Sequence, residues 1–159
     1  KYSVLEGGTR TPLITYWKGK INPAVSDEIV CTIDLAASLA GYVGVELDDE
    51  ACLDSIDVMD AFLGLPAAKG REHLVQQDNG AGGNFGFRVG KWKLQRHDSK
   101  RARNVVVETL LANTPVAQYR LYDLVSDPSE QRDVLGENPE LAEQLKQRLT
   151  EIISVGRSR

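Results

Sequence analysis

The sequence lacks an excess of basic residues and has no long apolar run. Its 19 lysines and arginines face 23 aspartates and glutamates, which leaves a formal net charge of −4. Such a chain has no overall positive field to attract the phosphates of a nucleic acid. No apolar run approaches the roughly 20 residues that a membrane-spanning helix needs. The first residues also lack the basic and apolar stretches of a signal peptide. The compartment stays open, because residues upstream of Lys1 could carry such a signal.

Histidine and cysteine are scarce as well. The only histidines are His73 and His97, which are too few for a metal cage or a histidine-based triad. Cys31 and Cys52 match no metal-ligand spacing and are too few for a disulfide framework. Two free thiols are expected, while a single bridge between them stays open because the sequence does not supply its geometry. Without a G-x-S-x-G, P-loop or H-E-x-x-H motif, a self-contained hydrolytic site is not expected.

What is present is the composition of a folded domain. Of the 159 residues, 42% are hydrophobic and 26% are charged, which is typical of globular chains. The apolar periodicity predicts an α+β order, in which a strand and two helices precede several antiparallel strands and a terminal helix. The helices are expected at residues 32–44, at 58–64 and at Pro139–Val155. The strands are expected at residues 12–17 and 72–77, in a hairpin over 85–96 that turns at Val89-Gly90, and at 119–124.

The hairpin contains the stretch KWKL, in which charged and apolar residues alternate. This alternation is typical of a strand with one solvated face, so Lys91, Lys93 and His97 are expected to be solvated. The later stretch Lys100–Arg103 is strongly basic. It is interpreted as a solvated loop, with contact to a sulfated polyanion as the alternative.

The opening stretch, KYSVLEGGTR, is dense in charge and glycine. Gly7 and Gly8 permit backbone conformations that other residues avoid, and they let another group approach closely. Lys1 could hold an anion, because a charge pair about 4 Å apart is worth roughly 4 kcal/mol at an effective dielectric constant near 20. From the residues alone, a surface turn with an ion pair between Arg10 and Glu6 is the simpler interpretation.

The same stretch resembles a signature of the type I sulfatases of the alkaline-phosphatase superfamily. In that family a lysine precedes an E-G-G-x-R-x-P turn, which W-x-G-x-I usually follows, and this chain has EGGTRTP and WKGKI. The stretches VSDEIVCTIDLAASLAGYVGVEL, LDSIDVMDAFLG, REHLV, FRVGKWKL, LYDLVSDPSEQRDV and GRSR resemble further family motifs in the correct order. The resemblance covers the chain except residues 100–114.

The resemblance implies a specific chemistry. In this family a cysteine or serine of a C/S-x-P-x-R motif becomes formylglycine, and Asp and Asn side chains hold a divalent cation, usually calcium. A lysine at the position of Lys1 contacts the sulfate, while Glu6, Gly7, Gly8 and Arg10 would shape the active-site turn. The first strand of the C-terminal sub-domain can contribute substrate contacts, which makes His73 a weaker candidate.

The departures from the family are equally specific. Neither Cys31 nor Cys52 is followed by the proline and arginine of the modification motif, so neither should become formylglycine. Asp78-Asn79-Gly80 copies a metal-binding D-N-G motif, but it follows the E-G-G turn where the family has it before. It is interpreted as a coincidental turn. We therefore expect no metal site in this chain, with the nucleophile and the metal outside it.

The resemblance predicts the C-terminal portion of a sulfatase. Residues 1–64 would complete a large α/β domain, and residues 65–159 would form a sub-domain with about four antiparallel strands and a C-terminal helix. The parent would hydrolyse aryl or carbohydrate sulfate esters, and this chain alone would be inactive. The expected partners are the missing N-terminal half and a sulfated substrate, with self-association through unpaired strands also expected. A phosphonate or phosphate-ester hydrolase of the same superfamily and a non-catalytic glycan-binding module remain as alternatives.

Overall fold

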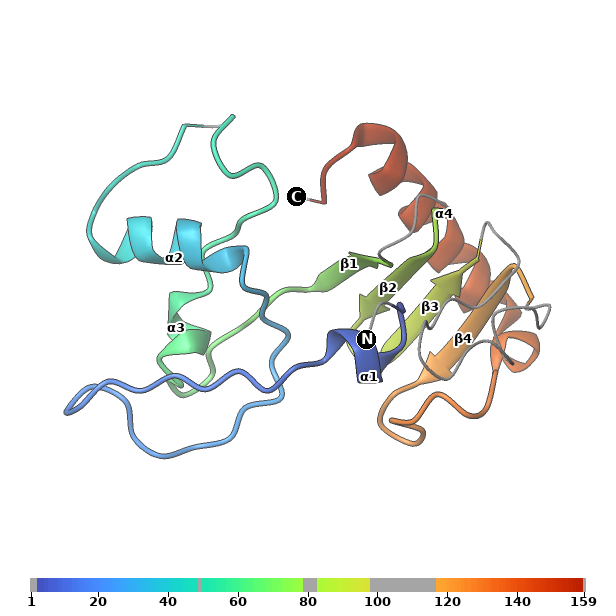
Figure 1. Ribbon diagram of the computed structural model, residues 1–159, viewed down its shortest axis with the longest axis horizontal. Helices are drawn as coiled ribbons and strands as arrows, with labels where there is room; N and C mark the ends of the chain where they lie inside the picture. The colour runs from blue at the N-terminus through green and yellow to red at the C-terminus, as the bar shows by residue number, and fades with distance from the viewer. Residues whose placement is uncertain (1–2, 49, 79–82, 98–116, 159) are drawn as a thin grey trace. The chain divides into compact units, whose positions relative to one another are not determined.

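The alternating second half of the chain forms an antiparallel sheet of four strands in the order β1-β2-β3-β4 (Figure 1). Its strands are β1 (His73–Gln77), β2 (Phe85–Val89), β3 (Trp92–Arg96) and β4 (Tyr119–Asp123). Val89 pairs with Trp92, so the hairpin turns at Gly90-Lys91, one residue later than predicted. Gly90 has a φ of +54°, which a residue without a Cβ adopts at little cost. The position of Gly90 therefore determines where the hairpin turns.

This is a computed structural model, and it describes residues 3–48, 50–78, 83–97 and 117–158. The chain divides into two compact units. Unit 1 comprises residues 1–12 and 73–154, and unit 2 comprises residues 13–72 and 155–159. The expected boundary after Gly64 concerns the domains of a longer protein and stays a prediction. In the part of the chain that is described, no helix has the length and apolar character needed to cross a membrane.

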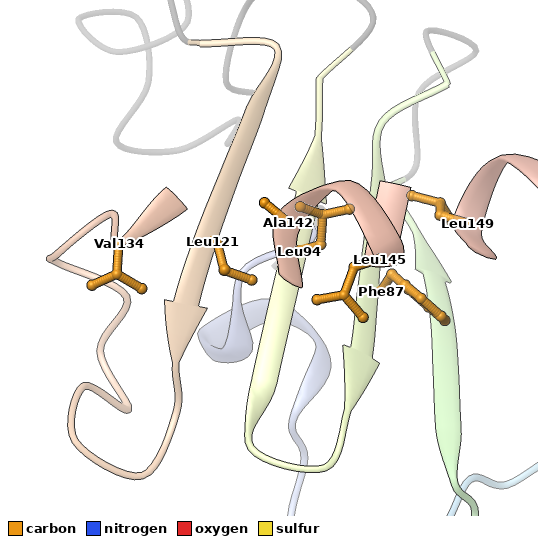
Figure 2. Packing of buried hydrophobic residues seen from close by; sticks show 7 residues of the cluster. All are labelled: Phe87, Leu94, Leu121, Val134, Ala142, Leu145 and Leu149. Atoms are coloured by element: carbon orange, nitrogen blue, oxygen red, sulfur yellow. The ribbon is translucent and has the colours of Figure 1, made fainter. Parts of the chain in front are cut away.

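Helix α4 (Pro139–Val155) covers one face of the sheet, with the bounds that the sequence predicted. Phe87, Leu94 and Leu121 lie opposite one another on neighbouring strands. They point toward Leu145 and Leu149 of α4 (Figure 2). All five side chains are at least 97% buried, and each contributes about 1.5–3 kcal/mol. The core of unit 1 therefore lies between the sheet and α4, and the α+β prediction of a sheet with a C-terminal helix is confirmed.

The N-terminal segment covers the other face of the same sheet. Its single helical turn, α1 (Glu6–Thr9), and helix α4 lie on opposite sides of the strands (Figures 1 and 2). A Cβ on Gly86 would lie 3.2 Å from both the Val4 carbonyl oxygen and Lys93 Cε, so a side chain there would crowd the segment. Val4 itself is only 2% exposed. A short 3₁₀ turn, η1 (Leu135–Glu137), leads into α4.

Unit 2 contains α2 (Asp34–Tyr42) and α3 (Met59–Phe62), within the two ranges where the sequence predicted helices. The buried residues of α2 are polar, namely Asp34 and Ser38. Asp34 Oδ1 accepts hydrogen bonds from Arg71 Nη1 at 2.6 Å and from the Ile56 N–H at 3.1 Å. A buried ion pair therefore holds α2 by its polar side.

The strand predicted at residues 12–17 is wrong. This segment is irregular, and Ile14 and Tyr16 are 88% and 84% exposed. A strand needs a neighbour to pair its N–H and C=O groups. Within the described part of the chain, the four paired strands all lie in unit 1. The apolar pattern of residues 12–17 is therefore present without the sheet that it would require.

Candidate functional site

The E-G-G turn is the candidate site, although Lys1 itself lies outside the described residues. The turn starts at Glu6, and the Arg10 N–H closes it by donating to the Glu6 carbonyl oxygen at 2.8 Å. Both glycines have ordinary negative φ angles. A Cβ on Gly8 would lie 2.7 Å from the Ser3 carbonyl oxygen, while one on Gly7 would meet nothing within 4 Å. The turn therefore needs glycine at Gly8 for close approach and not for a left-handed backbone.

The side chain of Glu6, the first residue of this turn, is buried in an ion cluster. Its Oε1 accepts a hydrogen bond from Lys93 Nζ at 2.7 Å, and its backbone N–H donates to Glu130 Oε2 at 2.6 Å. Lys93 Nζ also lies 3.4 Å from Glu130 Oε1. The exposed fractions of Glu6, Lys93 and Glu130 are 6%, 0% and 8%. A buried charge is tolerated when it is paired and hydrogen-bonded, and here one ammonium group lies between two carboxylates.

Gln95 and His97 continue the cluster along β3 and beyond its end. Gln95 Nε2 donates to Glu130 Oε1 at 2.8 Å, and His97 Nε2 lies 3.2 Å from Gln95 Oε1. We call Glu6, Lys93, Gln95 and Glu130 the anchor network. The expectation that Lys93 and His97 are solvated is wrong. The N-terminal segment covers the sheet face on which they lie, while Lys91 in the turn is exposed as predicted.

Burial lowers the pKa of His97, and the positive charge of Arg120 lowers it further. The carboxylate of Asp78 opposes this shift. Desolvation disfavours the charged imidazolium. The neutral ring therefore donates through Nε2 when it bonds to the Gln95 carbonyl oxygen.

Two guanidinium groups lie near the remaining carboxylate oxygen of Glu6. Arg88 Nη1 is 3.9 Å and Arg10 Nη1 is 4.0 Å from Oε2. The predicted ion pair between Arg10 and Glu6 is therefore present, at the limit of contact and with the Arg10 side chain 53% exposed. A pair at this distance with one half-exposed partner contributes little, whereas Lys93 and Glu130 make short, buried contacts with Glu6.

Glu130 holds its place at a conformational cost. Its φ is +54°, in the left-handed region that costs a non-glycine residue about 1–3 kcal/mol. Its two carboxylate oxygens accept from the Glu6 N–H and from Gln95 Nε2, and Oε1 also lies near Lys93 Nζ. Three donors therefore converge on one strained, buried carboxylate. These contacts hold the turn in place.

His73 lies on the other face of the sheet. Its neighbour two positions along, Val75, pairs with the core residue Phe87. The His73 ring packs edge-on against the Phe87 ring at 5.7 Å between centroids. The structure thus places His73 on the α4 side and the anchored turn on the opposite side, so it does not bring these two candidates together. Its role in substrate binding stays a prediction.

The remaining candidates add no metal centre to the described residues. Asp78 is buried and accepts a hydrogen bond from Asn84 Nδ2 at 2.7 Å, while Asn79 and Gly80 lie outside the description. Across residues 3–48, 50–78, 83–97 and 117–158, no three His, Cys, Asp or Glu side chains gather in a way that could hold a metal. Cys31 and Cys52 are free thiols, of which Cys52 is exposed. The basic stretch Lys100–Arg103 also lies outside the description.

Known proteins provide an independent comparison. The chain is 32% identical over 152 residues to an N-acetylgalactosamine-6-O-sulfatase of Bacteroides thetaiotaomicron, covering 96% of this chain and 29% of the relative. It is 30% identical over 162 residues to human arylsulfatase A, covering 92% of this chain and 31% of the relative. No family model matches. The chain thus spans about three tenths of the length of these curated relatives.

Solved structures agree with the sequence relatives. A sulfatase structure from a study of glycosaminoglycan metabolism by Bacteroides thetaiotaomicron superposes with a TM-score of 0.81 at 31% identity. The superposition covers 96% of this chain and 31% of that structure. A 2-O glycosaminoglycan sulfatase shares the fold at a TM-score of 0.51 and 16% identity, over 76% of this chain and 24% of its own. The chain belongs to the sulfatases and corresponds to a C-terminal portion of them.

Proposed function

We propose that this chain forms part of an enzyme that hydrolyses sulfate esters, and that its E-G-G turn brings Lys1 to the sulfate. The observation that carries this proposal is the sulfatase likeness over 96% of the chain, at 31–32% identity in sequence and structure. The anchored turn supports it, since Glu6 is fixed five positions after the lysine of the family signature.

The chemical contribution of Lys1 follows from its charge. Cleavage of the S–O bond of a sulfate ester builds negative charge on the leaving oxygen, beside sulfate oxygens that are already charged. A cation placed beforehand at that position stabilises the transition state more than the ground state, and removing one such group typically costs a factor of about 10²–10³ in rate. Lys1 would act as this cation, and the anchor network would act only through the turn.

Formylglycine and a divalent cation, calcium being the usual one, are proposed for the parent and not for this chain. The described residues do not fit a metal, because no three candidate ligands gather in them. The sequence around Cys31 and Cys52 does not fit formylglycine, since both lack the proline and arginine of the modification motif. To residues 1–159 we assign binding, orientation and the electrostatic contribution of Lys1, and we expect this chain alone to be inactive.

The missing N-terminal half is the proposed partner of unit 2. Apart from Leu5 and Val125, the exposed large hydrophobic residues of the described chain all belong to unit 2. On α2 the apolar residues Leu35, Leu39 and Tyr42 are exposed. An apolar helix face of this kind normally packs on another element. This chain leaves about seven tenths of the length of its relatives unmatched. The corresponding part of the longer protein is the proposed element that packs on this face of α2.

Aryl or carbohydrate sulfate esters are the proposed substrate class. The Bacteroides relative is named for a 6-O-sulfated N-acetylgalactosamine, so esters of that type should be tested first, beside a simple aryl sulfate. Nothing in the comparisons favours a phosphonate or phosphate-ester hydrolase or a non-catalytic glycan-binding module.

The test is an assay of the longer protein that contains this segment, in its wild-type form and as Lys1→Met. The expected result is sulfate release that falls about 10²–10³-fold in the variant. Lys18→Met, which removes a charge from an exposed turn of unit 2, should leave the rate unchanged. Wild-type protein that releases phosphate but not sulfate would favour the alternative hydrolase, and a fully active Lys1→Met variant would remove Lys1 from the site.

A further inference from the structure

Glu130 combines three features in unit 1. It is buried, its backbone is left-handed, and its carboxylate accepts from the backbone N–H of a residue 124 positions away. The other non-glycine residues of the described chain with positive φ, Cys52 and Ala67, are both exposed and lie in unit 2. An observed backbone outlier at a buried site points to a function that outweighs its cost.

The contacts show what Glu130 does. A contact between two side chains leaves the backbone free to move, because both side chains are flexible. Glu130 Oε2 instead accepts the backbone N–H of Glu6 and so restrains the main chain of the turn. Lys93 then fixes the Glu6 carboxylate from β3. The turn is therefore tied to strand β3 directly, through the Glu6 side chain, and indirectly through its main chain, because Glu130 lies in the loop after β4 and is itself held by Gln95 of β3.

We propose that Glu130 and Lys93 are positioning residues for the sulfatase reaction, which they serve by fixing the E-G-G turn on the sheet. This inference rests on the proposed function, because its effect on rate requires that the turn places Lys1 at the sulfate. Neither residue touches the substrate. A displacement of about 1 Å at a catalytic group can cost a factor of about 10², so a loosened turn is expected to slow the reaction without any change in the reacting groups.

The test variant is Glu130→Gly in the longer sulfatase, because glycine removes the carboxylate and also relieves the left-handed backbone. The variant therefore removes the contacts of Glu130 in the anchor network without adding backbone strain that could unfold unit 1. Ala67→Gly is the matched control, since it relieves a φ of +59° at an exposed position outside the network. Glu130→Gln is a second variant, which keeps a side-chain oxygen able to accept the Glu6 N–H.

Three measurements are made on each variant. Hydrogen exchange is followed in peptides covering residues 4–10 and in peptides covering β2 and β3. The kcat and KM for a sulfate ester and the inhibition constant of inorganic sulfate are measured beside it. For Glu130→Gly we expect faster exchange only in residues 4–10, a kcat at least about 10-fold lower and weaker inhibition by sulfate. Glu130→Gln should retain more activity than Glu130→Gly, and Ala67→Gly should match the wild type.

The inhibition constant distinguishes positioning from folding. A purely structural role would lower the fraction of active enzyme, and hence the apparent kcat, while the inhibition constant of sulfate stayed constant. That result, or unchanged exchange in residues 4–10, would overturn the inference. A wild-type protein that hydrolyses no sulfate ester would instead refute the proposed function, and the exchange data would still decide whether Glu130 anchors the turn.

Discussion

The carboxylate of Glu130 accepts the backbone N–H of Glu6 at 2.6 Å, which joins two residues 124 positions apart in the chain. This bond closes unit 1, because it ties the N-terminal turn to the loop between β4 and α4. Its environment contains little water, since Glu6 and Glu130 are both less than 9% exposed. A hydrogen bond to a charged group in such a place is stronger than a neutral one. The turn is therefore held to the rest of unit 1 by a buried, charge-assisted hydrogen bond.

Lys93→Met tests how much of unit 1 depends on the buried charge. The variant leaves the carboxylates of Glu6 and Glu130 without their shared ammonium group, so the free energy of unfolding should fall by about 3–5 kcal/mol. Lys91→Met is the control, because it removes the same charge from an exposed pair with Asp123 and should cause little change. Denaturant unfolding followed by Trp92 fluorescence in a Trp17→Phe background reports on unit 1. Equal midpoints for the two variants would contradict the prediction.

Gly8→Ala and Gly7→Ala form a second matched pair. The new Cβ at Gly8 would lie 2.7 Å from the Ser3 carbonyl oxygen, and the one at Gly7 would meet nothing within 4 Å. Gly8→Ala should therefore destabilise the turn by about 1–3 kcal/mol. Gly7→Ala should be neutral or stabilising by up to about 1 kcal/mol, since alanine favours a helical turn. Thermal unfolding of both variants checks this, and the reverse order of stability would show that the turn is built differently.

His97 should make the stability of unit 1 depend on pH. Burial and Arg120 lower its pKa in the folded state below the ordinary 6.5, against the opposing charge of Asp78. The unfolded chain therefore takes up a proton first as the pH falls below about 6.5, and the free energy of unfolding decreases from there down to the folded pKa. Above pH 7 both states are neutral at His97 and no such loss applies.

The measurement is denaturant unfolding between pH 8 and pH 5 for the wild type and for His97→Gln. The variant should lose less stability on acidification, because glutamine does not titrate. Parallel pH profiles for the two proteins would show that His97 does not contribute.

The sequence predicted the fold well where one side of an element is apolar. The leucines of α4 predicted the bounds of this helix, and the alternation of β2 and β3 predicted the hairpin with its turn one residue too early, because burial decides the period of each element. The same alternation misassigned Lys93 and His97. Alternating polar and apolar residues show that a strand has one polar face, but they do not show whether solvent or another segment covers that face. In this protein the N-terminal segment covers it. The partner of Lys93 is Glu6, 87 positions away, and such a long-range contact leaves no local signal.

Unit 2 shows the opposite case, because its apolar pattern exceeds what it buries. Residues 12–17 have the composition of a buried strand, yet they are irregular and exposed. A buried strand requires neighbouring strands. The local sequence of residues 12–17 does not show whether such neighbours are present within residues 1–159. For the candidate site, the signature around Glu6 was readable from the sequence, whereas Gln95 and Glu130 had to be found by geometry.

Self-association of this chain is the last prediction, and it now rests on exposed side chains and not on an unpaired strand. Leu35, Leu39 and Tyr42 present an apolar face of α2 at 40%, 54% and 45% exposure. Two such faces can bury each other at about 25 cal/mol per Å² of apolar area. Sedimentation velocity at rising concentration should therefore show association of the wild-type chain. Leu39→Lys should abolish it while preserving the helix, because leucine and lysine have similar helix propensities.

Val125→Lys supplies the control for that experiment. It introduces the same charge at an apolar residue that is 78% exposed but lies in unit 1, so association should persist. A wild-type chain that stays strictly monomeric at all concentrations would contradict the prediction, as would equal association of the Leu39→Lys variant. Loss of association in both variants would indicate that added positive charge, and not the apolar face of α2, controls it.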